Sequence, residues 1–453
     1  MPPFRDESIF VIATGSQTTK VQYGLPESLT PAQKVVSTRV YRTAQSGFSM
    51  EGAESDAVYP IKDGIIEDLE ALQYLIGYLY RTTINLAPDA TPFSPILMTS
   101  NSEWRPKQIE SIISYVFNTL HVPAVTVIPE SLAAVFSYAS PTACVVNIGY
   151  EKTEITPVVD FCISDTAQEV FHGVGGKLIN EELEALLPNL KPYQIEELKR
   201  SKIYEILSEI SMGFFGEPSQ PATTSLEDEG IVDVAAIVTS DNARELLAQR
   251  EQQLQNGKQV ELKNSEMPRN SFVDSTGNRI EVGTERFKGA EKLVEQLAQA
   301  IGRTIAKMDD ITKRGDCWDN IVLVGGPTVI RGFVDAVLLS LQEHFLVNRT
   351  NTFSEIPSGI NTPGGYGSPI GSAYGQMHTM GHGQVPTSIK IARLADYFLG
   401  WKGHTWENAQ FLGCQIAAKQ IFTPGIASID GAYISKEDFA EYGAKQIWSL
   451  GLF

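Results

Sequence analysis

Two segments of the sequence share one pattern, an apolar strand, a turn of small residues and a second apolar strand. The first segment occupies residues 9–24 and turns at residues 14–16, and the second occupies residues 144–159 and turns near Gly149. This pattern is typical of a β-hairpin whose turn could hold a phosphate tail. Each hairpin begins a separate stretch of alternating strands and helices, so the sequence predicts two related halves built on one plan.

A third apolar strand, residues 321–324, leads directly into Gly325 and Gly326. Because glycine has no Cβ, backbone N–H groups in such a turn can approach a phosphate or a nucleotide base closely. The alternative is a tight turn between a core strand and a helix, and a Gly-Gly pair by itself favours that alternative. The two hairpins expected to face this strand give the nucleotide interpretation its weight.

Further segments match one known family in the same order along the chain. They occupy residues 59–66, 95–99, 107–120, 122–124, 131–140, 283–287 and 433–437. On these segments the chain resembles the actin-related proteins over nearly its whole length. The likeness is greatest to the divergent fungal branch of that family found in chromatin remodellers, at residues 3–5, 16–19, 234–247 and 419–423.

The resemblance implies an α/β chain with the actin-like fold, a duplicated ribonuclease H-like architecture with two lobes and four subdomains. Hsp70 chaperones and sugar kinases share this architecture. The first lobe would comprise residues 1–138 and 388–453, with a small outer subdomain at residues 31–65.

The second lobe would comprise residues 139–387, with an outer subdomain at residues 174–284. Two segments look inserted relative to actin, at residues 217–280 and 351–387. The second of them is rich in Gly, Pro, Ser and Thr, so it cannot bury enough apolar surface to offset its ordering entropy. We expect it to be a flexible loop.

Actin-like ATPases hold a hard divalent cation on the nucleotide phosphates through carboxylates and waters, and they position a group beside the attacking water. The resemblance places other residues at these positions. Acids of the family are replaced by Ala13, Asn147 and Tyr150, a frequent histidine is replaced by Glu154, and a glutamine is replaced by Leu132. No glutamine lies nearby to substitute, so we expect catalysis to be absent.

Nucleotide binding is expected to be weak or absent. Tyr150 adds bulk where the phosphates would pass, and Glu151 and Glu154 add negative charge there. Two unit charges about 4 Å apart interact by roughly 4 kcal/mol at an effective surface dielectric, close to a thousandfold in affinity. Turn geometry explains the vestigial nucleotide-binding positions better than a ligand does: Gly15, Ser16, Lys20, Gly149, Gly325, Gly326 and Thr328. No cofactor is expected, although the intact Gly-Gly turn leaves adenine binding without hydrolysis open.

Lys20 has two interpretations. Its ammonium group could reach a phosphate, but a lone lysine on a strand is more often a surface or salt-bridged residue. The other candidate ligands are weaker still. The four cysteines are scattered without paired metal-ligand spacing, and His378 and His382 lie in a glycine-rich run without a supporting acid. No metal site is expected.

The chain carries 36 basic and 54 acidic residues, a net charge of −18. An acidic surface repels phosphate backbones at long range, so direct nucleic-acid binding is not expected and a basic protein partner suits the chain better. No apolar run approaches the length of a membrane span, so no membrane contact is expected.

In the actin family, a groove between the two halves receives helices from partner proteins. The resemblance places Tyr138, Ala417, Gln420 and Ile421 along this groove. Helix-in-groove binding needs an apolar trough, but the same residues could be ordinary core packing, and the sequence supports both alternatives equally. The implied partner is the long basic helix that precedes the ATPase domain of an SWI/SNF- or RSC-type remodeller. A second actin-related protein, of the number-seven type, would form a heterodimer with this chain.

Three classes of function therefore compete. The resemblance favours a non-catalytic, nuclear subunit that assembles with the other subunits of a chromatin remodeller. The second class is an ATP-binding actin-like protein with weak hydrolysis, which would bind labelled ATP and magnesium at micromolar affinity. The third is a filament-forming cytoskeletal protein. The short outer subdomain and the two insertions disfavour it, because they should disturb longitudinal contacts.

Overall fold

The computed structural model describes residues 4–44, 47–85, 93–207, 264–346, 386–395, 397–401, 406–423 and 431–452. The chain forms two compact units. Unit 1 comprises Met1–Lys177, Glu295–Thr328 and Ser340–Phe453, and unit 2 comprises Leu178–Val294 and Val329–Leu339. Unit 1 contains residues from both lobes expected from the sequence, and the lobe boundaries stay a prediction.

The two predicted insertions fall largely outside the described residues. Of the loop predicted at residues 351–387, only residues 386–387 are described, and of the segment at residues 217–280, only residues 264–280. Among the helices that the structure describes, none is long and apolar enough to cross a lipid bilayer.

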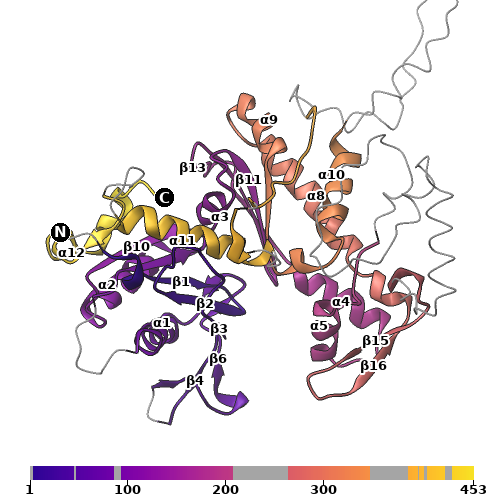
Figure 1. The fold of residues 1–453 in the computed structure, drawn as a ribbon, viewed down its shortest axis with the longest axis horizontal. Coiled ribbons are helices and arrows are strands. Elements are labelled where there is room, and N and C mark those ends of the chain that lie inside the picture. Colours follow the sequence, from indigo (N-terminus) through magenta and orange to yellow (C-terminus); the bar gives the residue numbers. More distant parts are fainter. Residues whose placement is uncertain are drawn as a thin grey trace, which may run out of the picture. The chain divides into compact units, whose positions relative to one another are not determined.

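The first sheet of unit 1 has six strands in the order β18-β10-β9-β1-β2-β3 (Figure 1). These strands are β1 (Phe10–Thr14), β2 (Thr18–Tyr23), β3 (Lys34–Ser37), β9 (Ile96–Ser100), β10 (Ala124–Pro129) and β18 (Ile434–Ser435). β9 lies parallel to both β1 and β10, whereas β1 and β2 form the predicted antiparallel hairpin. The parallel strands β9 and β10 are buried along their whole length, as expected for strands covered on both faces.

The second sheet of unit 1 repeats this plan. Its order is β13-β12-β11-β17, and β14 also pairs with β12. The strands are β11 (Ala143–Ile148), β12 (Lys152–Val159), β13 (Cys162–Ile163), β14 (Glu169–His172) and β17 (Ile321–Gly325). β11 and β12 form the predicted second hairpin, and β17 lies parallel to β11. A hairpin with a parallel neighbouring strand thus occurs twice, which confirms the prediction of two halves built on one plan.

Three small sheets contain the other described strands. They are β4 (Val40–Arg42) with β5 (Phe48–Ser49) and β6 (Ala57–Val58), β7 (Ile61–Lys62) with β8 (Ile65–Ile66), and β15 (Asn270–Val273) with β16 (Arg279–Val282). Asp63 and Gly64 form the turn between β7 and β8, with φ angles of 50° and 77°. A two-residue hairpin turn of this kind needs positive φ at both positions, which Asp-Gly tolerates well.

Helices cover both faces of the six-stranded sheet (Figure 1). The described α-helices are α1 (Leu69–Ile84), α2 (Pro106–Asn118), α3 (Glu130–Tyr138), α4 (Gly176–Leu186), α5 (Pro192–Arg200), α8 (Glu291–Ala306), α9 (Ile311–Asp319), α10 (Phe333–Phe345), α11 (Ala409–Phe422) and α12 (Lys436–Tyr442). α1 and α2 share a core with Phe10 and Ile12, and α3 and α11 share the other core with Ile9 and Val11. Alternate residues of one strand therefore enter opposite cores, as its two-residue period requires.

Local sequence signals set the two ends of α1. The side chain of Asp68 caps the first turn by accepting the Ala71 N–H at 3.0 Å, and Asn85 ends the helix in the left-handed conformation with φ of 56°. Asp and Asn are favoured at these positions for those reasons. Between the caps, apolar residues spaced by three and four, such as Leu72 and Ile76, are buried on one side.

α11 approaches α3 very closely. A Cβ added to Gly413 of α11 would lie 1.6 Å from the main-chain oxygen of Ala133 in α3. Only glycine, which has no side chain, permits this separation of the two backbones. The contact fixes α11 against the helix that follows β10.

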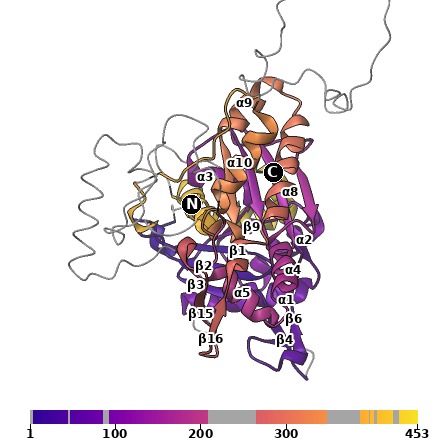
Figure 2. The same cartoon turned by 90° about the vertical axis from the view of Figure 1, so that its right-hand side faces the viewer.

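Unit 2 contains a fully buried arginine. The Arg286 guanidinium donates to the main-chain oxygens of Gly283, Asn264 and Met267 at 2.5–2.6 Å. These bonds satisfy the buried donors of the side chain. The β15–β16 hairpin lies beside α5 (Figure 2), and a side-chain hydrogen bond of 3.0 Å joins the two.

Gly413→Ala should lower the free energy of unfolding by about 3 kcal/mol, because the added Cβ forces the backbones of α3 and α11 apart. Gly315→Ala is the matched control. Gly315 lies in α9, where an added Cβ meets no atom within 4 Å. Helix propensity predicts that the free energy of unfolding of the control rises by about 0.5–1 kcal/mol. Urea denaturation of both full-length variants measures the difference, and the same small effect at both positions would contradict the close helix contact.

Candidate functional site

The turn of the first hairpin is closed by contacts within unit 1. The Gly15 N–H donates to the Thr18 carbonyl oxygen at 2.9 Å, and Ser16 Oγ accepts the Gly64 N–H at 2.9 Å. Gly64 belongs to the β7–β8 turn. The hydroxyl group of Ser16, a predicted vestigial nucleotide-binding position, therefore holds another turn of the same unit.

The polar groups in the turn of the second hairpin are also hydrogen-bonded within the protein. The Gly149 N–H donates to the Lys152 carbonyl oxygen at 2.8 Å. The carbonyl oxygens of Gly149 and Tyr150 accept the N–H groups of Gly176 and Lys177, the first residues of α4, at 2.9 and 2.7 Å. N–H groups at a helix N-terminus often bind anions because they have no partner within the helix. Here they bind the hairpin itself.

The two predicted glycines at the end of β17, Gly325 and Gly326, differ in their roles. Gly325 has φ of 107°, and an added Cβ would lie 2.1 Å from the carbonyl oxygen of Ile148 in β11. The close pairing of β17 and β11 therefore requires glycine at this position. Thr328 Oγ1 donates to the Gly325 carbonyl oxygen at 2.7 Å, which closes the turn. Gly326 is different, because a Cβ there would meet no atom within 4 Å.

Lys20 lies on β2 opposite Ala13, one of the positions where an acid is replaced. Its Nζ donates to the main-chain oxygen of Glu407 at 3.1 Å. Burial lowers the pKa of the Lys20 ammonium, and the nearby Glu407 and Glu130 carboxylates offset part of that effect. Lys20 is half-buried and its ammonium group is bonded to the backbone, so a vestigial nucleotide-binding role for this residue stays a prediction.

Asn147, which replaces an acid on β11, donates from Nδ2 to Glu130 Oε2 at 2.7 Å. Glu130 begins α3 and was not among the predicted site residues. The pKa of Glu130 is raised to about 7, mainly by burial and next by the nearby Glu154 carboxylate. The available sequence signal was a glutamate directly after the buried strand β10, at the start of the connecting helix. A carboxyl group is thus present near the replaced acid, but on a different element.

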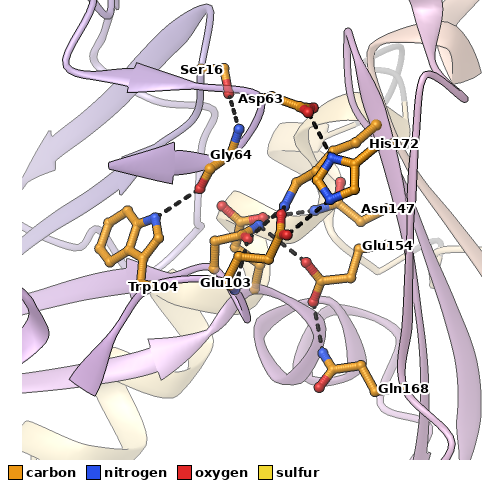
Figure 3. Close-up of polar contacts among 12 residues, drawn as sticks. Ser16, Asp63, Gly64, Glu103, Trp104, Asn147, Glu154, Gln168 and His172 are labelled. Carbon is orange, nitrogen blue, oxygen red and sulfur yellow. Dashed lines mark hydrogen bonds and ion pairs between the residues drawn. The ribbon is translucent and has the colours of Figure 1, made fainter. Parts of the chain in front are cut away.

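Glu154 of β12 is almost fully buried, with 4% exposure. Its two oxygens accept hydrogen bonds from Asn101 Nδ2 at 3.1 Å and Gln168 Nε2 at 2.9 Å (Figure 3). Burial raises the pKa of Glu154. Glu151 forms an ion pair with Lys177 at 3.2 Å. Both glutamates expected to repel a phosphate have protein partners, so the repulsion is smaller than that of free charges.

His172 of β14 lies between two carboxylates that the sequence analysis did not single out. Its Nδ1 is 2.6 Å from Asp63 Oδ2, and its Nε2 is 3.0 Å from Glu103 Oε1 (Figure 3). The hydrogen bond with Asp63 is the main reason that the pKa of His172 is raised. The Lys152 ammonium contacts the same Glu103 carboxylate. These residues are far apart in the sequence, and no motif connects them.

The remaining predicted residues belong to one apolar cluster. Its buried members include Leu132, Tyr138, Ala417 and Ile421, and Ala13 packs against it. Gln420 is half-buried. Burial of three of the four predicted groove residues favours core packing, the alternative left open above, and leaves Gln420 as the member best placed to meet a partner. Helix binding at this groove stays a prediction.

A magnesium nucleotide does not fit these side chains. The positions that would supply carboxylates hold Ala13, Asn147 and Tyr150. The Gly15 and Gly149 N–H groups and the Thr328 hydroxyl donate to protein oxygens, and the Ser16 hydroxyl accepts from the Gly64 N–H. In the described part of the chain, no group of three His, Cys, Asp or Glu side chains could hold a metal ion. This protein therefore differs from an actin-like ATPase in the side chains at the predicted ligand positions and not in the arrangement of its strands.

Comparison with known proteins identifies the family. The profile of the actin family matches residues 5–356, more than half of the chain. The chain belongs to the actin family, and the predicted actin-like α/β fold is confirmed.

The chain is also similar to particular members of this family. It is 27% identical to the SWI/SNF and RSC complexes subunit arp9 of Schizosaccharomyces pombe, over 99% of this chain and 99% of that protein. It is 26% identical to centractin of the same organism, over 62% of this chain and 66% of centractin. It is 26% identical to actin-related protein 7 of Saccharomyces cerevisiae, over 40% of this chain and 41% of that protein. The predicted likeness to the fungal remodeller branch of the family is confirmed.

Glu130→Gln should make stability less dependent on pH. In the unfolded chain Glu130 ionises near its ordinary pKa of 4.5, and in the folded protein near 7. The native state therefore holds its proton more tightly, and stability is lost as pH rises from the lower value through the higher one. One pKa unit corresponds to about 1.4 kcal/mol. The free energy of unfolding of the variant should therefore exceed that of the parent by about 1–3 kcal/mol at pH 8. It should match the parent near pH 4.

Urea unfolding at the two pH values measures this difference. Glu437→Gln, an exposed carboxylate of α12, is the control and should give no pH-dependent change. A gain of the same size at both pH values would show that Glu130 is not the titrating group.

Proposed function

We propose that this protein is a non-catalytic, actin-related subunit of an SWI/SNF- or RSC-type ATP-dependent chromatin-remodelling complex. The observation that carries the proposal is the 27% identity, over 99% of both chains, to a protein named as a subunit of SWI/SNF and RSC complexes. The match extends over nearly the whole length of both chains. Chromatin remodellers act on chromosomes, so the proposed location is the nucleus.

The proposed lack of catalysis is supported by the side chains around the two hairpins. Phosphoryl transfer depends on a bound cation, on groups that stabilise the transferred phosphoryl group and on a positioned water. The residues at the expected ligand positions include Ala13 and Asn147, and Leu132 at the water-positioning site is buried in the core. Ser16 and Lys20 bond to other parts of the protein.

The proposed partner is the helix that precedes the ATPase domain of the remodeller's motor subunit. A net charge of −18 favours a basic helix, because charge complementarity speeds association and selects among partners. A second actin-related protein, of the number-seven type, would pair with this chain on the same helix. The role is to assemble the complex and to couple its motor to the other subunits.

The partners can be tested by purification of the full-length, tagged protein from its own cells. We expect to recover a remodeller ATPase and a second actin-related protein. The matched control is a remodeller ATPase that lacks only the segment before its ATPase domain. This protein and the second actin-related protein should both fail to bind that truncated ATPase. Recovery of cytoskeletal regulators alone would reject the proposal.

Gln420→Arg should weaken binding of the remodeller helix at least fivefold, because it places a positive charge on α11 against a basic partner. Gln420 is half-buried, so the variant should keep its fold. Gln299→Arg is the matched control on an exposed position of α8. Titration of the helix against each full-length variant measures the affinities. Equal affinities for the two variants would place the helix away from α11.

Equilibrium binding of labelled ATP with magnesium tests the alternative of an actin-like ATPase. We expect no saturation below roughly 1 mM ATP, a binding free energy weaker than about −4 kcal/mol. Micromolar affinity together with phosphate release would establish the alternative. Sedimentation under polymerising salt tests the cytoskeletal role, and a pelleted filament fraction would favour it.

A further inference from the structure

Two charged side chains of β12 lie on the same face of the strand. Lys152 and Glu154 are two residues apart, which is the period of a strand. Lys152 is buried, with its Nζ donating to Asn101 Oδ1 at 2.8 Å and forming an ion pair with the Glu103 carboxylate. Asn101 Nδ2 in turn donates to Glu154 Oε2 at 3.1 Å. The amide of Asn101 therefore bridges the ammonium group and the second carboxylate.

His172 extends these contacts to the next strand. β14 pairs with β12 so that His172 lies opposite Lys152. The imidazole bonds to Asp63 through Nδ1 and to Glu103 through Nε2 (Figure 3). Glu103 thus contacts both Lys152 and His172, and Asp63 connects His172 to the β7–β8 turn.

The β7–β8 turn fits closely against Lys152. A Cβ added to Gly64 would lie 2.2 Å from Lys152 Cε, so the turn touches the aliphatic part of the side chain. The Gly64 N–H donates to Ser16 Oγ at 2.9 Å, and its carbonyl oxygen accepts from Trp104 Nε1 at 3.0 Å (Figure 3). The turn is therefore bonded to the first hairpin, to the segment after β9 and, through Asp63, to β14.

We propose that six side chains form a latch that holds the two predicted lobes together without a nucleotide or a metal ion. The latch consists of Asp63, Asn101, Glu103, Lys152, Glu154 and His172. The first three belong to the predicted first lobe and the last three to the predicted second lobe. Lys152 supplies the positive charge that a bound cation would supply, and the carboxylates of both lobes gather around it and His172.

Burial of Lys152 and Glu154 makes these two members of the latch depend on their partners. Removing one partner of a buried ion pair is strongly unfavourable, because the other charge is left without compensation. Without Lys152, Glu103 would keep only His172, and Glu154 would lose the cation beside it. The carboxylates would then repel one another across the boundary between the predicted lobes.

Lys152→Met in the full-length protein tests the latch by hydrogen–deuterium exchange and mass spectrometry. Peptides that contain Gly64 and Trp104 should exchange at least tenfold faster, while peptides from the β15–β16 hairpin of unit 2 should be unchanged. Lys313→Met is the matched control, since Lys313 pairs with Asp160 and Asp316 outside the latch. Its exchange should stay within twofold of the parent everywhere. Unchanged exchange around Gly64 in Lys152→Met would overturn the proposal.

If Lys152→Met does not fold, a second pair of variants tests the latch. Glu103→Gln and His172→Gln change side chains that are partly exposed, so both should fold. Each single variant should speed exchange at Gly64, and because the two side chains contact each other directly, the double variant should speed it by less than the product of the two single effects. Effects that multiply would mean that the residues act independently, and the latch would be rejected.

The latch goes beyond the remodeller assignment and does not rest on it. Loss of the partner proteins in the purification experiment would leave the exchange results unaffected. Normal exchange in Lys152→Met would in turn leave the proposed assembly role standing.

Discussion

The buried Lys152 ammonium is the constraint on which the arrangement around the two hairpins depends. A buried charge is stable only when nearby groups compensate it, so Glu103 and Asn101 must be held within reach of β12. That requirement fixes the segment after β9 and, through His172, the β7–β8 turn. The Ser16 hydroxyl is then used to hold that turn. One strand position thus determines how several polar groups are used.

The glycines around the hairpins are not all present for the same reason. Gly325 is required by backbone geometry, because any Cβ would overlap the neighbouring strand. Gly326 has open space around its Cα and no such requirement. A glycine near a former ligand site is therefore weak support for ligand binding when strand packing alone requires it. The side chains at the predicted ligand positions are more informative, and Ala13 and Asn147 carry no carboxylate.

The sequence predicted the elements better than the contacts between them. Alternating apolar residues and small turn residues located both hairpins and the strand before Gly325, because these signals are local. The pairing of Lys152 with Glu103 joins residues 49 positions apart, and His172 and Asp63 are 109 positions apart. No periodicity encodes such pairs. Glu130 was missed for a related reason, since its raised pKa comes from burial that only the folded chain creates.

A body held together by its own side chains responds to nucleotide differently from an ATPase. A ligand shifts a conformational equilibrium only by as much as its affinities for the two states differ. With Ser16, Lys20 and the hairpin turns bonded internally, ATP has few groups to bind. We therefore expect the shape to stay the same whatever the ATP concentration. In the proposed role this constancy is useful, because the neighbouring motor consumes ATP in every cycle while its docking partner must keep one surface.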